Sequence, residues 1–79
     1  METKRKLNNS IIKERLKYEI ENCGLKKKFI AKMVGVKPTM ITAYTNSKKM
    51  PSLETFANIC EVLNLDANYV LGIRDFESE

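Results

Sequence analysis

The chain has 79 residues, of which 43% are hydrophobic and 30% are charged, and its formal net charge is +4. This length accommodates one domain, and the apolar share is large enough for a folded core, which argues against a disordered chain. The charge is uneven, because residues 1–40 carry 11 basic and 4 acidic side chains (+7) whereas residues 41–79 carry 3 and 6 (−3). The basic half predicts an anionic partner, either nucleic acid or an anionic membrane surface.

Several features argue against other function classes. The chain has no histidine, the commonest general base, so neither an enzyme nor a zinc site nor a cofactor is expected. Cys23 and Cys60 form no CxxC pair and are expected as buried residues on helices, without a disulfide or a metal. No apolar run approaches the roughly 20 residues that span a bilayer, and the first residues lack the apolar stretch of a signal peptide. A cytoplasmic protein is therefore expected.

The first expected helix runs from residue 9 or 10 to about residue 23. Its apolar residues recur at spacings of four, four and three and so line one face: Ile12, Leu16, Ile20 and Cys23. Asn9 or Ser10 is suited to cap its start. Gly24 then allows the chain to leave the helix through a left-handed conformation.

Residues 26–34 and 38–45 predict two short helices joined by a turn. In the first, Ile30, Ala31 and Val34 share an apolar face, and Gly35 ends it. Pro38 is tolerated at the first position of the second helix, where its missing amide hydrogen has no helical partner. Two short helices joined by a turn that contains glycine indicate a helix-turn-helix, whose second helix enters the DNA major groove.

The polar and cationic residues 46–51 predict an exposed loop. Ser52 is suited to cap a fourth helix, whose apolar residues recur at helical spacing: Leu53, Phe56, Ile59, Cys60 and Leu63. Asp66 is suited to cap a short fifth helix that Gly72 ends. The prediction is thus an all-α, five-helix domain over residues 9–73, preceded by a basic tail (1–8) and followed by an acidic tail (74–79).

Several of these residues together form a recognisable pattern: Gly24, Leu25, Ala31, Val34–Val36, Ile41, Tyr44, Pro51–Thr55, and Leu63 with Leu71 and Gly72. With this pattern, the stretch from Ile12 to Gly72 resembles the phage repressor and Cro-like helix-turn-helix family, often called the XRE family. The resemblance implies a compact lambda-repressor-like domain that binds double-stranded operator DNA. It also implies a transcriptional regulator, of the repressor type found in phages and mobile elements.

In that family the DNA contacts come from the start of the second helix, the exposed face of the third helix and the loop after it. The resemblance therefore implies base contacts from the third helix, by Pro38, Thr39, Met40, Thr42 and Ala43. It implies phosphate contacts from the surrounding polar residues, namely Lys26, Lys27, Lys28, Lys37, Asn46, Lys48 and Lys49. The threonines can bond to base edges, and a methyl-sized apolar group can contact a thymine methyl.

Three departures from the family pattern carry expectations of their own. The third helix lacks the glutamine, asparagine, serine and arginine that are frequent there, so direct base readout is expected to be modest and DNA shape more important. Ile20 and Thr45 stand where the family often has an arginine–glutamate pair, and an apolar contact is expected instead. Lys37 stands where a serine or threonine cap is usual, which costs roughly 1 kcal/mol of capping.

Members of the family commonly bind palindromic sites as dimers, so a homodimer is expected. Its candidate interface lies at the end of the domain, at Tyr69, Val70, Ile73 and Phe76, although these residues alternatively close the core. An alternative function is a protein-interaction module of the same fold, such as an antitoxin or an inhibitor. Membrane-surface binding is disfavoured because residues 26–34 lack the large apolar face that insertion needs.

Overall fold

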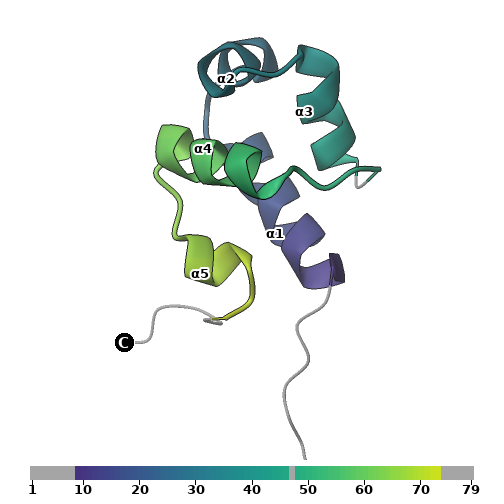
Figure 1. The fold of residues 1–79 in the computed structure, drawn as a ribbon, viewed down its shortest axis with the longest axis vertical. Helices are drawn as coiled ribbons and strands as arrows, with labels where there is room; N and C mark the ends of the chain where they lie inside the picture. Colours follow the sequence, from purple (N-terminus) through teal and green to yellow (C-terminus); the bar gives the residue numbers. More distant parts are fainter. Residues whose placement is uncertain (1–8, 47, 74–79) are drawn as a thin grey trace, which may run out of the picture.

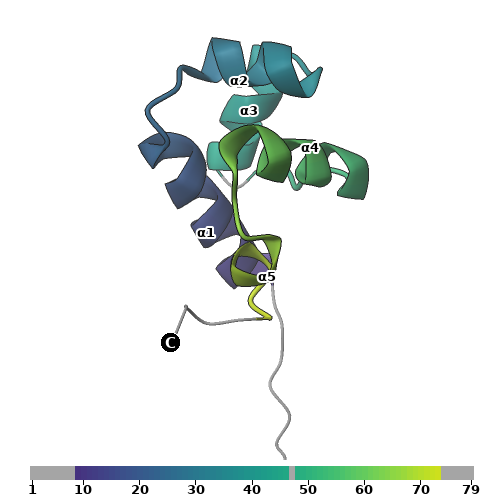
Figure 2. The same cartoon turned by 90° about the vertical axis from the view of Figure 1, so that its left-hand side faces the viewer.

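The computed structural model describes residues 9–46 and 48–73, and this part of the chain contains five α-helices. They are α1 (Asn9–Asn22), α2 (Lys27–Val34), α3 (Pro38–Thr45), α4 (Leu53–Leu63) and α5 (Ala67–Val70). In Figure 1, α2 and α3 lie together at one end of the molecule, α4 crosses the middle, and α5 lies towards the other end. Figure 2 shows α5 beside the first turns of α1. The all-α, five-helix prediction is confirmed.

One hydrophobic core joins all five helices. Each helix contributes at least one side chain with 1% or less of its surface exposed: Leu16 and Ile20 from α1, Ile30 from α2, Ile41 from α3, Ile59 from α4 and Val70 from α5. Burying an aliphatic side chain of this size stabilises a fold by about 1.5–3 kcal/mol relative to leaving it in water. The core therefore holds α2 and α3 in place without using the outer face of either helix.

The fourth helix begins where predicted, but the first residue of its apolar pattern does not face the core. Leu53 is 82% exposed, whereas Phe56 and Ile59 are buried as expected. Successive helical residues are rotated by about 100°, so Leu53, six positions before Ile59, lies about 120° from it around the helix. That angle turns Leu53 away from the core.

Two glycines shape the connections around α2 as the sequence predicts. Gly24, after α1, has a φ of 85°, and Gly35, after α2, has a φ of 92°. The amides of Gly35 and Val36 both donate to the Ala31 carbonyl, at 2.8 and 3.0 Å. This closes the last turn of α2, and the chain then enters α3 at Pro38, so the predicted helix-turn-helix is confirmed.

The caps predicted for α4 and α5 are also confirmed. The Ser52 hydroxyl accepts a hydrogen bond from the Thr55 amide at 3.1 Å. The Asp66 carboxylate accepts from the amides of Asn68 and Tyr69, at 3.0 and 3.4 Å. For α1, the helix begins at Asn9, but the side chains of residues 9 and 10 lie outside the described part.

A long-range contact attaches α5 to α1. The Arg15 guanidinium donates through Nη1 to the Tyr69 carbonyl at 2.6 Å, and it also lies 4.2 Å from the centre of the Tyr69 ring. A cation over an aromatic face adds to the stability of such a contact by about 0.5–1 kcal/mol when exposed and more when desolvated. A helix of four residues is marginal alone, so this attachment is important for α5.

The two cysteines are free thiols in the described structure. Both are half-buried and not fully buried as expected; Cys60 lies on α4 as predicted, but Cys23 lies in the bend that follows α1 and not on the helix. Its position there is explained by Gly24, since the chain is already leaving the helix one residue earlier. Burial raises the pKa of the Cys60 thiol, and the nearby Asp66 carboxylate raises it further.

Candidate nucleic-acid interface

The outer face of α3 consists mainly of three exposed side chains, Pro38, Thr39 and Thr42. The inner face is formed by the buried Ile41, Tyr44 and Thr45, and burial raises the pKa of the Tyr44 hydroxyl. Two predicted base contacts are only half-exposed: Met40, which packs against the core, and Ala43. Met40, expected on the exposed face of the third helix, therefore contributes to the core as well. Its position follows from the buried Tyr44, because residues four apart lie on nearly the same face of an α-helix.

Three consecutive lysines lie at the start of α2, and one of them contacts α3. Lys26 and Lys28 are exposed, whereas Lys27 is half-buried and its Nζ donates to the Thr45 hydroxyl at 3.2 Å. That hydroxyl in turn donates to the Thr42 carbonyl at 2.9 Å. Lys27 therefore joins the first turn of α2 to the last turn of α3.

This contact adds polar partners at Thr45, where an apolar contact with Ile20 was expected. Both side chains are buried, with 1% and 3% exposed, but the Thr45 hydroxyl is held by polar partners. A buried hydroxyl costs free energy unless it forms hydrogen bonds, and Lys27 and the Thr42 carbonyl supply them. No spacing rule indicates the pair, because Lys27 and Thr45 are 18 residues apart.

The N-termini of α2 and α3 differ from those of α4 and α5. Their N-cap residues are Lys26 and Lys37, and neither forms a side-chain cap hydrogen bond within the described structure, which agrees with the expected loss of a cap at Lys37. The first amides of a helix point outward and attract anions, and lysines beside them add positive charge. Two helix starts thus combine uncapped amides with ammonium groups, a combination suited to phosphate.

The loop after α3 is held against that helix by backbone hydrogen bonds. The amides of Lys48 and Lys49 donate to the Ala43 carbonyl at 3.0 and 3.3 Å, and the Asn46 side chain accepts from the Lys48 amide at 3.1 Å. Asn46, Lys48 and Lys49 are exposed. Because Lys27 reaches Thr45 and this loop bonds to Ala43, two basic segments meet the carboxyl-terminal half of α3.

The predicted dimer residues divide into three environments. Val70 is 1% exposed and belongs to the core, so its side chain is not on the surface. Tyr69 is half-buried and carries the Arg15 contact, and Ile73 is 55% exposed. Phe76 lies outside the described residues.

Other kinds of site find no support in the described parts of the chain. Residues 9–46 and 48–73 contain no group of three or more histidine, cysteine, aspartate or glutamate side chains that could hold a metal ion. None of the helices described is long and apolar enough to cross a membrane.

Comparison with known protein families gives a match over most of the chain. A protein-family model described as helix-turn-helix, HTH_3, matches residues 16–70, more than two thirds of the chain. The matched range extends from the buried Leu16 of α1 to the buried Val70 of α5 and includes both helices of the turn motif. No curated protein and no solved structure matches the chain.

Proposed function

Because the chain belongs to the helix-turn-helix family HTH_3, the family of Cro- and XRE-like DNA-binding regulators, we propose that it is a sequence-specific transcriptional regulator. It acts on double-stranded DNA, with α3 lying in the major groove. It is a repressor of the phage or mobile-element type, which blocks transcription by occupying a promoter.

The observation that carries this proposal is the pair of uncapped, lysine-bearing helix starts at α2 and α3. A regulator must grip the phosphate backbone on each side of the groove that its second helix enters. Lys26 and Lys28 would contact phosphate at the start of α2, and Lys37 at the start of α3. Lys48 and Lys49 would do so beyond the end of α3, so that phosphate contacts flank that helix.

Base reading is assigned to the exposed threonines of α3. Thr39 and Thr42 are three residues apart and therefore share a face of the helix. Each hydroxyl can donate to or accept from a base edge, and Pro38 and Ala43 offer apolar contact to a thymine methyl. Such contacts are weaker than bidentate ones, so sequence-dependent DNA shape would supply part of the specificity.

The regulator would bind a palindromic site as a homodimer, which places two α3 helices about one DNA turn apart. Of the residues expected at the interface, the exposed Ile73 is the described side chain best placed to meet a partner. Binding through two linked modules increases affinity without any new DNA contact.

The test is a fluorescence-anisotropy titration of the purified chain. The two probes are a duplex from upstream of the chain's own gene and a shuffled duplex of equal composition, each at two salt concentrations. We expect tighter binding to the upstream duplex, and affinity that falls steeply with salt because counterions are released from phosphates.

Three alanine variants separate the assigned roles. Lys28→Ala should lower the slope of log affinity against log salt by about 1, for both duplexes alike. Thr39→Ala should reduce the preference for the upstream duplex several-fold, since it removes one hydrogen bond worth about 1 kcal/mol. Lys17→Ala, an exposed lysine on α1 to which no DNA contact is assigned, is the matched control and should behave as wild type.

Equal and weak binding to both duplexes would contradict the regulator proposal. It would favour the second function that the sequence allows, a helix-turn-helix module that binds a protein, such as an antitoxin or an inhibitor. Loss of affinity in Lys17→Ala equal to that in Lys28→Ala would refute the assigned interface while leaving DNA binding itself intact.

A further inference from the structure

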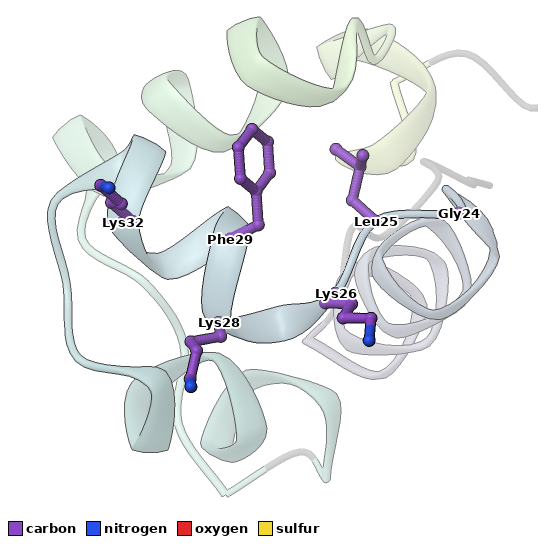
Figure 3. A pocket seen from close by; sticks show the side chains of 6 residues that line it. All are labelled: Gly24, Leu25, Lys26, Lys28, Phe29 and Lys32. Atoms are coloured by element: carbon purple, nitrogen blue, oxygen red, sulfur yellow. The ribbon is translucent and has the colours of Figure 1, made fainter.

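Although residues 26–34 were expected to lack a large apolar face, α2 and the connection before it carry an exposed apolar stripe. Leu25, Phe29 and Met33 are 41%, 47% and 54% exposed, and they are four residues apart, which aligns them along one helix face. A hollow of about 490 Å³ opens beside Leu25 and Phe29. Figure 3 shows the side chains of Phe29, on α2, and Leu25, on the connection before it, pointing the same way. The hollow is large enough for an aromatic side chain and its neighbours.

Positive charge borders this hollow, which we call the Phe29 pocket. Its lining includes Lys26, Lys28 and Lys32, all exposed. In Figure 3, Phe29 and Leu25 point to one side, the side chains of Lys26 and Lys28 extend to the other side, and Lys32 lies farther along α2. Two Phe29 pockets from different molecules cannot pack against each other, because the lysines of one pocket would face the lysines of the other. The chemistry requires an occupant with an apolar centre and carboxylates on its flanks.

The chain itself contains a segment with this chemistry. Residues 74–79 are Arg-Asp-Phe-Glu-Ser-Glu, in which the aromatic Phe76 has a carboxylate on each side, at Asp75 and Glu77. We propose that Phe76 of one molecule inserts into the Phe29 pocket of a second copy. Asp75 and Glu77 then pair with the lysines around it, and the two aromatic rings stack against each other.

The arrangement of the helices favours insertion of Phe76 into the pocket of a second copy over insertion into the pocket of its own molecule. α5, which precedes this segment, lies at the opposite end of the molecule from α2 in both views, and α4 lies between them in Figure 1. If each molecule inserts its Phe76 into the other, the exchange is symmetric and closes as a dimer, without growing into a filament.

This inference rests on the homodimer in the proposed function and does not depend on DNA binding. If the chain both exchanges Phe76 and binds DNA as proposed, the acidic segment and DNA phosphates compete for Lys26 and Lys28. The free dimer would then have to release these lysines before both α2 helices engage DNA.

The first experiment uses the labelled full chain carrying Phe76→Ala, so that its own segment leaves the pocket open. The probe is a synthetic peptide of residues 73–79, added while backbone amide shifts are followed by NMR. We expect saturable shifts confined to residues 25–33, weakened by added salt. A peptide with serine in place of Phe76 should bind at least about tenfold more weakly, since the buried ring supplies most of the apolar contact.

The second experiment tests whether the occupant comes from another molecule. Without DNA, the wild-type chain should form dimers in sedimentation equilibrium, and Phe76→Ala or Phe29→Ser should raise the dissociation constant about tenfold or more. Tyr18→Ser, an aromatic 62% exposed on α1, is the matched control and should leave it unchanged. Lys28→Glu should weaken the dimer, and mixing that variant with Glu77→Lys should restore association.

Three results would overturn the proposal. The first is peptide shifts that fall outside residues 25–33 or that do not depend on Phe76. The second is shifts at the pocket of the wild-type chain that do not change with protein concentration, which would mean insertion within one molecule. The third is a dimer that Phe29→Ser and Tyr18→Ser weaken equally. None of these results bears on the anisotropy titration, so failure here and failure of the regulator proposal are distinguishable.

Discussion

Replacing Gly35 by alanine isolates the backbone cost of the turn between α2 and α3. Gly35 has a φ of 92°, and a Cβ added there meets no other atom within 4 Å. The methyl group therefore causes no clash with a neighbour, and the cost comes from the left-handed conformation alone, about 1–2 kcal/mol. A domain of this size has a stability of roughly 4–12 kcal/mol, so the loss is a measurable fraction.

Two further variants turn this into a test of the reasoning. Asparagine has a larger side chain than alanine but adopts positive φ more readily, as Asn64 does in this chain with a φ of 56°. We therefore expect Gly35→Asn to destabilise less than Gly35→Ala. Gly24 has a φ of 85° and is equally open, so Gly24→Ala should lower stability by the same amount as Gly35→Ala.

The assay is urea unfolding followed by far-ultraviolet circular dichroism, with the free energy extrapolated to water. In thermal unfolding, each 1 kcal/mol should lower the midpoint by about 4–8 °C. A Gly35→Asn variant less stable than Gly35→Ala would mean that steric fit limits the turn, and the reasoning from φ would be refuted. A Gly35→Ala variant as stable as the wild type would refute the same reasoning.

Three other predictions concern single side chains. Thr45→Val keeps the side-chain volume but removes the hydrogen bonds with Lys27 and the Thr42 carbonyl. Urea unfolding should therefore show a free energy of unfolding about 1 kcal/mol lower, and an unchanged value would mean that water replaces both hydrogen bonds. Ser52→Ala removes the α4 cap and should cost about 1 kcal/mol in the same assay, whereas an unchanged midpoint would show the cap to be dispensable. Because the pKa of Cys60 is raised in the folded state, its contribution to stability is complete below about pH 8.5 and falls as the pH rises further. Cys60→Ala should therefore lose less stability than the wild type between neutral and alkaline pH. Equal losses in the variant and the wild type would contradict this direction of the pH dependence.

The sequence predicted most of the fold because its local signals agree with one another. Pro38, Gly35 and Gly24 each have a backbone preference that marks a helix boundary, and the structure has a boundary at each. Ser52 and Asp66 act as caps for the same kind of local reason. Such signals need only neighbouring residues, so they can be recognised without knowing the rest of the fold.

What the sequence did not predict depends on contacts between distant parts of the chain. The hydrogen bond from Lys27 Nζ to Thr45 was not expected, because only the packing of α2 on α3 brings the two side chains together. The Arg15–Tyr69 contact joins residues 54 apart and was not expected. Leu53 followed the apolar pattern but faces solvent, which its angle from Ile59 explains once the direction of the core is known.

The Arg15–Tyr69 contact also has a consequence for the order of folding. Closing a loop of about 54 residues is entropically more costly than forming the short connection between α2 and α3. We therefore expect the helix-turn-helix to form early and α5 to dock late. In native-state hydrogen exchange, α5 amides should open in a low-energy event that leaves the α2 and α3 amides protected. The end of the domain that precedes the acidic segment would then detach and rejoin many times for each complete unfolding of the chain.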